Sequence, residues 1–287
     1  MALRIHFLKS DKPREWLLAD AVLRGAEKHG NVVSSSSLGE DHDPETCDVA
    51  CFFGVKSREL FQKYHRADVH TLMIDKGYVR GKPTAGVVGP WKFWRVAIDA
   101  HHPTSRLSSL RLPDDRFRAL GLEDHPWRTK GRHILLAGSS AKYHTFYGTM
   151  DPTMYAKKLV AQMREHTERS IVYRPKPSWR EAVSLTKCGY SRPPELLAEA
   201  LDRAWVMVTH GSNACFEAVL AGVPTIITGD GVSLPISSSD LADIENPRLA
   251  SDAERGQWLA NLAYFQWTIG EFASGAAWEF IGEQIHA

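Results

Sequence analysis

The chain has 287 residues, of which 43% are hydrophobic and 24% charged, and its formal net charge is +1. This composition is typical of a globular protein with one or two domains and excludes a disordered or fibrous chain. No apolar stretch reaches the roughly 20 residues that a membrane-spanning helix needs. Charged residues also follow the start too soon for a secretory signal. We therefore expect a cytoplasmic protein without a membrane span.

The first half of the chain alternates patterns typical of strands and helices. Apolar runs that predict strands lie at 4–8, 48–55 and 70–75. Segments with helical patterns lie between them, at 13–29 and 57–68. Strands and helices that alternate at this spacing predict a parallel sheet with helices on its faces. Residues 1–125 are therefore expected to form one Rossmann-like domain.

Residues 77–130 interrupt this alternation and are rich in glycine, proline, tryptophan and arginine. Between His70 and Arg111 the chain has seven basic residues and two acidic ones, with aromatic residues between them. Such a stretch can face a polyanion, or it can be ordinary solvated surface. The side chains that we expect to contact an acceptor are Lys76, Arg80, Lys82, Trp91, Trp94 and Arg95.

The alternation resumes in the second half. Predicted strands lie at 133–137, 170–174, 205–209 and 223–228, with helical segments between them. Residues 131–250 are expected to form a second Rossmann-like domain, and 251–287 a helical tail. The sequence thus predicts an α/β protein whose two Rossmann-like domains face a cleft. Ligands bind outside the carboxyl ends of the strands in such folds.

The most informative segment is 208–218, VTHGSNACFEA, where a predicted strand turns through a glycine into a helix. Backbone amides at the start of a helix favour a phosphate. Glu217, one turn into the helix, can reach ribose hydroxyls. The alternative is that these residues only cap the helix and turn the chain.

The run HGSNACFEAVLAGVPTIITG at 210–229 resembles the donor-binding segment of glycosyltransferases with the GT-B fold, especially capsule-type sugar transferases. The resemblance covers roughly residues 131–245. It implies a nucleotide-sugar donor, with a UDP-sugar expected first, and no metal ion. The residues that it implies in contact with the donor's diphosphate and ribose are His210, Gly211, Ser212, Asn213 and Glu217.

Two further turns offer donor-side groups. Arg174 and Lys176, in the run RPKP, resemble a basic turn of the same enzymes and are suited to a diphosphate, although a plain surface turn is the alternative. Gly138 and Ser139 follow the first predicted strand of the second domain and supply amide and hydroxyl donors.

The acceptor hydroxyl needs a general base, which we expect on the first domain. Asp11 comes after the first predicted strand, Asp75 ends the strand at 70–75, and Asp99 ends the apolar segment at 91–99. Asp75 and Asp99 are favoured because they border the basic, aromatic stretch. His101 and His102 are adjacent on an extended segment, so we expect them to point to opposite sides and not to share a metal.

The leading hypothesis is a glycosyltransferase that modifies a hydroxymethylated pyrimidine, such as 5-hydroxymethylcytosine, in bacteriophage DNA. Duplex DNA would then be its partner in the host cytoplasm. The basic stretch favours this acceptor, and the run from Gln266 to Trp278 resembles the tails of phage and prophage glycosyltransferase-like proteins. The alternatives are a capsule or lipopolysaccharide sugar transferase, a nucleotide-sugar epimerase or hydrolase on the same fold, and a non-catalytic binding protein.

Overall fold

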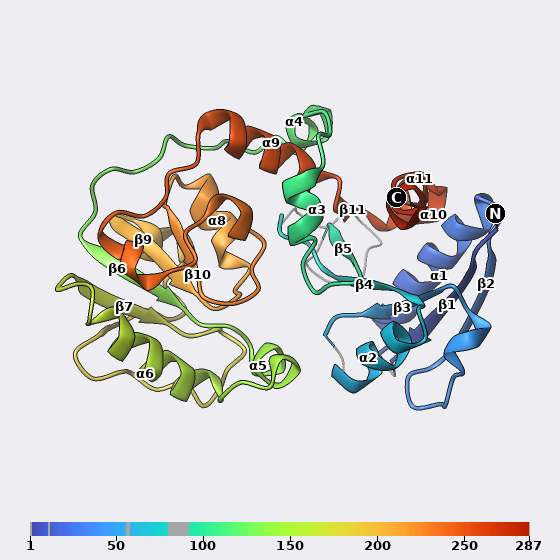
Figure 1. Cartoon of the computed structure of the whole chain (residues 1–287), viewed down its shortest axis with the longest axis horizontal. Coiled ribbons are helices and arrows are strands. Elements are labelled where there is room, and N and C mark those ends of the chain that lie inside the picture. Colours follow the sequence, from blue (N-terminus) through green and yellow to red (C-terminus); the bar gives the residue numbers. More distant parts are fainter. Residues whose placement is uncertain (1, 11, 56–57, 80–91, 287) are drawn as a thin grey trace. The chain divides into compact units, whose positions relative to one another are not determined.

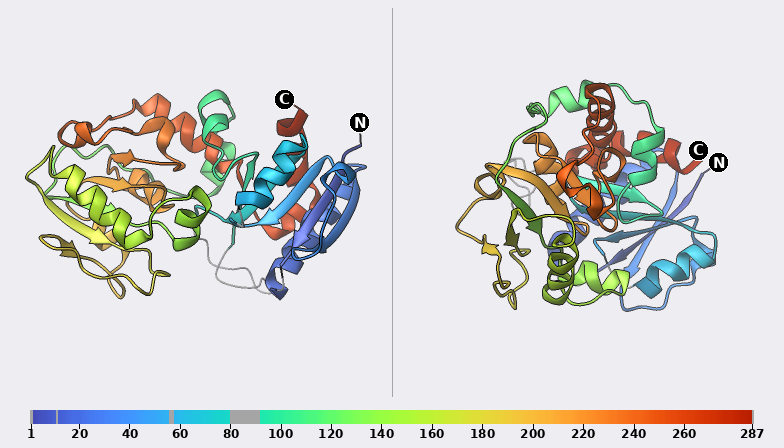
Figure 2. Two further views of the ribbon diagram at one scale, coloured as in Figure 1. Left: turned by 60° about the horizontal axis from the view of Figure 1, so that its bottom comes forward. Right: turned by 60° about the vertical axis from the view of Figure 1, so that its left-hand side comes forward.

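The computed structural model describes residues 2–10, 12–55, 58–79 and 92–286. The chain divides into two compact α/β units (Figure 1). Unit 1 consists of Met1–Pro103 together with Leu262–Ala287, and unit 2 consists of Thr104–Asn261. Both ends of the chain therefore belong to unit 1, as Figure 2 also shows.

Unit 1 contains a six-stranded sheet in the order β11-β5-β4-β3-β1-β2. Its strands are β1 (Arg4–Lys9), β2 (Val32–Ser37), β3 (Val49–Phe53), β4 (His70–Lys76), β5 (Trp94–Ile98) and β11 (Gln266–Trp267). The first four are parallel to one another, as the alternating pattern predicted. In contrast, β5 runs antiparallel to β4, and β11 runs antiparallel to β5.

The helices of unit 1 are α1 (Pro13–Lys28), α2 (Arg58–Arg66), α10 (Ile269–Ser274) and α11 (Ala276–His286), with a short 3₁₀ turn η1 (Pro44–Thr46). The last two helices pack on α1 (Figure 1). Gly25 permits this close approach, because a Cβ atom there would lie 1.9 Å from the carbonyl oxygen of Phe272. The indole N–H of Trp278 donates to the carbonyl oxygen of Val22 at 2.6 Å. The C-terminal residues are therefore part of the core of unit 1.

This division differs from the predicted ranges 1–125, 131–250 and 251–287, because residues from 104 onward already pack into unit 2. The amide of Asn261 donates to the carbonyl oxygens of Leu107 and Leu110 and accepts from the backbone of Leu112. These bonds tie the start of unit 2 to its last helix, α9 (Asp252–Ala263). The residues expected to form a tail therefore divide between the units: those up to Asn261 belong to unit 2, and those from Leu262 onward belong to unit 1.

Unit 2 contains a five-stranded parallel sheet in the order β10-β9-β6-β7-β8. Its strands are β6 (His133–Ala137), β7 (Ser170–Arg174), β8 (Gly189–Tyr190), β9 (Ala204–Thr209) and β10 (Thr225–Ile227). Its helices, besides α9, are α3 (Thr104–Ser109), α4 (Asp115–Ala119), α5 (Ala141–Tyr147), α6 (Pro152–Met163), α7 (Leu197–Leu201), α8 (Ala214–Leu220), η2 (Leu234–Ile236) and η3 (Leu241–Glu245).

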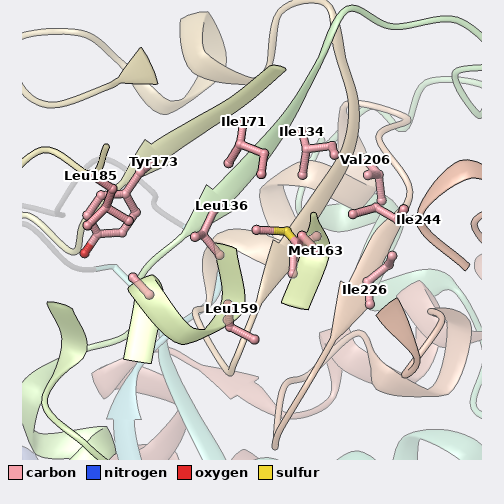
Figure 3. Packing of buried hydrophobic residues seen from close by; sticks show 12 residues of the cluster. Ile134, Leu136, Leu159, Met163, Ile171, Tyr173, Leu185, Val206, Ile226 and Ile244 are labelled. Carbon is pink, nitrogen blue, oxygen red and sulfur yellow. The ribbon is translucent and has the colours of Figure 1, made fainter. Parts of the chain in front are cut away.

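The core of unit 2 lies where α6 and η3 pack against one face of this sheet. Ile134, Val206 and Ile226 come from three neighbouring strands and are fully buried, and Met163 of α6 lies among them (Figure 3). Burial of such side chains contributes roughly 1.5–3 kcal/mol each to folding. The sheet is therefore a rigid base for the turns that follow its strands.

A pair of histidines joins β1 of unit 1 to the loop before β3. His6 is buried and hydrogen-bonds Ser34 and Ser36 of β2, at 2.8 Å each. Its ring stacks on that of His42, with centroids 3.5 Å apart. Burial, and then the neighbouring His42, lower the pKa of His6 to about 4. Both rings are accordingly neutral at pH 7.

Among the described residues, no helix is both long and apolar enough to cross a membrane.

Candidate functional site

The turns that follow β7, β6, β9 and β10 lie side by side at the carboxyl edge of the unit 2 sheet, because these neighbouring strands are parallel. They carry Lys176, then Gly138 and Ser139, then His210–Asn213, and finally Asp230. Gly138 is held against the next turn, since its N–H donates to the carbonyl oxygen of Arg174 at 2.8 Å. The fold thus gathers most of the predicted donor residues at one edge.

Gly211 sits at the most crowded point of this edge. A Cβ atom there would lie 2.2 Å from the hydroxyl oxygen of Tyr143 and 2.4 Å from the carbonyl oxygen of Asp230. The hydroxyl of Tyr143 donates to that carbonyl at 2.8 Å and accepts from the Asp230 N–H at 3.0 Å. Glycine is therefore required here for close packing of the β9 and β10 turns.

His210 is fixed from two sides. Its Nδ1 hydrogen-bonds the hydroxyl of Tyr155 at 2.9 Å, and its ring stacks on that of His144 with centroids 5.6 Å apart. Burial, followed by the effect of His144, lowers the pKa of His210 to about 4. The imidazole is neutral at pH 7, so it can offer a phosphate a hydrogen bond but no positive charge.

Ser139 has a buried hydroxyl, at 3% exposure, that finds no hydrogen-bond partner in the described part of the chain. Most buried polar groups are paired, and leaving one unpaired costs about 1–3 kcal/mol. The neighbouring Ser140 differs, because its hydroxyl accepts from the backbone N–H of Tyr143 and caps α5. The Ser139 hydroxyl and Nε2 of His210, which is also buried without a partner among the described residues, are therefore two groups at this edge that a ligand can satisfy.

The remaining predicted residues of the β9 turn lie at the start of α8. Ser212 is buried, and its hydroxyl accepts from the N–H of Ala214 at 3.4 Å. Asn213 is the N-cap residue, but its side chain makes no capping bond. Glu217 lies in the first turn of the helix and is half-buried. Their placement at the carboxyl edge matches the place where we expected a donor.

Arg174 does not lie as expected. Its guanidinium is buried and donates to the hydroxyl of Ser191 at 2.5 Å and to the carbonyl oxygen of Glu195 at 2.7 Å. It therefore anchors the segment after β8 and is not directed at a diphosphate. Lys176, two residues further on, is half-buried and is the cation that the β7 turn places at this edge.

On unit 1, Asp75 lies near the carboxyl end of β4. Its carboxylate is 28% exposed and lies 3.5 Å from Nη2 of Arg95. It also lies close to Gly54, since a Cβ atom at Gly54 would be 3.8 Å from Cγ of Asp75. Gly54 follows β3 and has φ +66°, a conformation that favours glycine. Lys76 follows at the end of β4 and is half-buried. Asp75 is therefore at the edge where ligands bind in such sheets.

Asp99 lies at the opposite edge of the same sheet. Because β5 is antiparallel to β4, the residue that follows it returns to the amino end of β4. The Asp99 carboxylate accepts from the N–H of Thr71 at 2.7 Å and contacts Nδ1 of His70 at 2.8 Å. The structure therefore separates the two favoured acids and gives Asp99 a structural role at the start of β4.

The expected acceptor contacts are only partly described. Arg80, Lys82 and Trp91, as well as Asp11, lie outside the described residues. Trp94 and Arg95 are each 2% exposed, so neither forms the accessible surface that stacking on a base or pairing with a phosphate requires. Their burial follows from β5 lying inside the sheet, between β4 and β11, and corrects their expected role.

Arg95 is enclosed by a polar cluster. It donates to the hydroxyl of Tyr78 at 3.2 Å, to the carbonyl oxygen of His101, to Nε2 of His101 at 2.9 Å and to Nδ1 of His102 at 3.1 Å. The two imidazole rings lie 4.3 Å apart. The prediction that they point to opposite sides was wrong, because the chain bends back after Asp99, which has φ +56°.

Three features of the site were missed by sequence reasoning. Tyr143 and Tyr155 lie on helices and carry no motif, although Gly211 signals the crowding that Tyr143 causes. The cluster around Arg95 depends on the antiparallel β5. Glu15, in the first turn of α1, is 2% exposed and accepts from the hydroxyl of Ser10, so it is a buried acid near the carboxyl end of β1.

A metal site was not expected, and no group of three or more suitable ligands occurs within residues 2–10, 12–55, 58–79 and 92–286.

No protein-family model and no curated protein matches the chain. Two solved structures are similar to it over almost their full length. Thermosulfurimonas dismutans KpsC, beta Kdo 2,7 transferase, aligns with a TM-score of 0.59 and 15% identity over 98% of this chain and 99% of that one. Thermosulfurimonas dismutans KpsC, beta Kdo 2,4 transferase, aligns with a TM-score of 0.58 and 14% identity over 93% and 92%. The chain therefore has the GT-B fold, as its donor-type segment predicted.

Proposed function

We propose that the protein is a glycosyltransferase that transfers a sugar from a nucleotide-sugar donor to a hydroxyl of a growing glycan. The observation that carries the proposal is the edge of the unit 2 sheet. There the buried hydroxyl of Ser139, which has no partner in the part of the chain that the structure describes, lies between the turns that bear Lys176 and His210. The negative charge of a leaving diphosphate must be stabilised. This edge offers one cation, hydroxyl and amide donors, and a neutral imidazole for that purpose. The half-buried Glu217 is the carboxylate proposed for the ribose.

A glycan is a better acceptor than DNA for this chain. The DNA hypothesis depended on a basic and aromatic surface that included Trp94 and Arg95, and both are buried. The fold is shared with two enzymes named as Kdo transferases. An acidic sugar such as Kdo is accordingly included among the donors to be tested, and a UDP-sugar remains the first donor that we expect.

Transfer is proposed to need no metal ion. Lys176 and the backbone amides of the β6 and β9 turns supply the positive potential that the leaving nucleotide requires. Activity is therefore expected to persist in excess EDTA.

The test is incubation of the purified protein with a panel of nucleotide sugars, activated Kdo included. Each donor is offered with two acceptors, capsule oligosaccharide and DNA that contains hydroxymethylcytosine, and products are read by mass spectrometry. A mass gain on the oligosaccharide alone supports the proposal. A gain on DNA alone restores the first hypothesis, and donor turnover without any transfer indicates an epimerase or hydrolase.

A further inference from the structure

The imidazole of His210 is held at the carboxyl edge of the unit 2 sheet by side chains of the same unit. The hydroxyl of Tyr155, on α6, lies 2.9 Å from Nδ1, and the two ring centroids lie 4.3 Å apart. The ring of His144, on α5, stacks on the imidazole. Nε2 is buried and has no partner within the described ranges. The protein therefore engages one ring nitrogen and leaves the other for a ligand.

The side of the imidazole that carries Nδ1 also lies against the turn after β10. A Cβ atom at Gly229 would lie 2.3 Å from both Nδ1 and Cε1 of His210, so only glycine permits this approach. Burial accounts for the low pKa of His210, and a hydrogen bond with the backbone of Thr228 acts against it. A backbone group that favours a protonated ring is a carbonyl oxygen, because only an acceptor does so. The Thr228 carbonyl and the Tyr155 hydroxyl therefore compete for Nδ1.

The hydroxyl of Tyr155 has a donor of its own. Burial raises the pKa of Tyr155, and a hydrogen bond with the side chain of Thr228 lowers it in part. A neighbour that favours the ionised phenol donates to its oxygen. The other contact of the Thr228 hydroxyl, the carbonyl oxygen of Thr209 at 3.5 Å, is longer than an ordinary hydrogen bond. The phenol proton is thus directed to Nδ1, and a neutral imidazole that accepts at Nδ1 carries its own proton on Nε2.

An N–H at Nε2 matches the second group of this edge that a ligand can satisfy. The hydroxyl of Ser139 is buried and, like Nε2, finds no partner in the described part of the chain. Its turn follows β6, which lies beside β9 with Ala137 opposite Thr209. A protonated Nε2 can only donate, whereas a hydroxyl can turn to donate or to accept. Two donors in neighbouring turns suit a group that only accepts, such as an ionised phosphate oxygen.

We infer that Tyr155 is a positioning residue for donor binding, because its hydroxyl keeps the proton of His210 on Nε2, where a phosphate oxygen of the donor accepts it. The inference rests on the proposed function. Without this hydroxyl, the Thr228 carbonyl draws the proton to Nδ1, and Nε2 becomes an acceptor that faces the phosphate unfavourably. The proton moves between two nitrogens of one ring, so the change needs no co-reactant.

The test is ¹⁵N NMR of the imidazole nitrogens at pH 7 in wild type, Tyr155→Phe and the control Tyr173→Phe. The chain has 13 histidines, and the His210 signals are those absent from the spectrum of His210→Ala. Wild type is expected to show a protonated Nε2 and an unprotonated Nδ1, and Tyr155→Phe the reverse. Tyr173 is also a buried tyrosine of unit 2, but its hydroxyl has no partner among the described residues. Tyr173→Phe should therefore match wild type.

Thr228→Val leaves Tyr155 in place but removes the hydroxyl that directs the phenol proton. It should increase the share of the form with a proton on Nδ1, so it serves if Tyr155→Phe does not fold. A wild-type protein with its proton on Nδ1 would overturn the inference. An unchanged tautomer in folded Tyr155→Phe, or in Thr228→Val where Tyr155→Phe does not fold, would do the same.

Binding shows whether Tyr155 acts through His210. Isothermal titration with UDP and with inorganic pyrophosphate measures wild type, Tyr155→Phe, His210→Ala and the double variant. Tyr155→Phe is expected to weaken binding about tenfold, the loss of one hydrogen bond to a charged group. In the His210→Ala background the same change should weaken it less than about twofold, because the two effects are not independent. A further tenfold loss there would show that Tyr155 contacts the ligand itself and would refute the positioning role.

The spectra need neither donor nor turnover, so they separate this inference from the proposed function. If wild type binds neither probe and transfers no sugar, yet Tyr155→Phe reverses the tautomer, the proposed function fails and the control of the His210 proton by Tyr155 stands. If sugar is transferred but the tautomer is the same in both proteins, the proposed function stands and the positioning role is refuted.

Discussion

At the scale of single residues, the role of a side chain at the unit 2 edge depends on whether the protein itself satisfies it. Ser139 and Ser140 are adjacent hydroxyls in one turn, yet one is buried without a partner among the described residues and the other caps α5. A sequence pattern treats them alike. Only the direction of each side chain separates a ligand-binding group from a structural one.

Ser139→Ala is therefore expected to weaken donor binding about tenfold while leaving folding unchanged or slightly more stable, since it removes an unpaired buried hydroxyl. Ser140→Ala, the matched control, should lose about 1 kcal/mol of unfolding free energy with the same donor affinity as wild type. Isothermal titration with the nucleotide sugar and thermal unfolding measure the two effects. Equal donor affinity for Ser139→Ala and wild type would remove this residue from the site.

The stacked pair of His6 and His42 gives a second prediction at this scale. The pKa of His6 is about 4 in the fold and near 6.5 in an unfolded chain, so the unfolded state binds the proton first. The stability of unit 1 is then complete above pH 6.5 and falls as the pH drops toward 4, by up to about 3 kcal/mol. Urea unfolding between pH 7 and 4 measures this loss.

His6→Gln cannot take up that proton, and it keeps a group that can bond Ser34 or Ser36. Its unfolding free energy should consequently fall less steeply with acid than that of wild type. Parallel curves for the two proteins would show that the acid sensitivity lies elsewhere, for instance at His210, whose pKa is also about 4.

At the scale of elements, the direction of β5, which the sequence did not predict, determines which residues meet at each edge of the unit 1 sheet. The pattern of alternating strands and helices correctly predicted β1, β3 and β4 and all the parallel strands of unit 2 that bear donor residues. It could not reveal the direction of β5, because an apolar run has the same period in either direction. That direction places Asp99 at the far edge and brings Arg95 to Asp75.

The RPKP turn shows the same limit on unit 2. Two cations two residues apart look equivalent in sequence, but β7 ends at Arg174, whose guanidinium turns toward Ser191 and Glu195. Lys176→Ala is therefore expected to raise the donor KM about tenfold with little change in Tm. Arg174→Met should instead lower Tm by several degrees, since a charge-assisted contact is worth about 1.5–3 kcal/mol.

Steady-state kinetics and thermal unfolding of the two variants distinguish these roles. A large rise in donor KM for Arg174→Met at an unchanged Tm would reassign that arginine to the donor. Because both variants remove a cation of the same turn, each serves as the control for the other in these two measurements.

At the scale of the whole molecule, two α/β units and a donor-type segment were enough to predict the GT-B fold. The boundaries were harder, since they depend on long-range packing of residues beyond Asn261. The close contact of α10 with Gly25 and the pairing of β11 with β5 join segments more than 150 residues apart. Patterns of neighbouring residues in the sequence do not reveal such contacts, so the C-terminal residues were predicted as a separate helical tail.

A chain that ends at Asn261 is expected to keep unit 2 folded and to lose unit 1, because β11, α10 and α11 are then missing. Hydrogen exchange followed by mass spectrometry should show wild-type protection for peptides of β6 and β9 and rapid exchange for those of β1 and β3. Slow exchange in both sets would mean that unit 1 does not depend on its C-terminal segment.

The discontinuous make-up of unit 1 also sets an order of events on the ribosome. Its first segment emerges early but must wait for residues 262–287, while unit 2, which is continuous, can finish folding in between. At about 5–20 residues per second, this delay is roughly ten to forty seconds. During that time β5 has an open edge and α1 an uncovered apolar face, so the nascent chain is a natural client for chaperones.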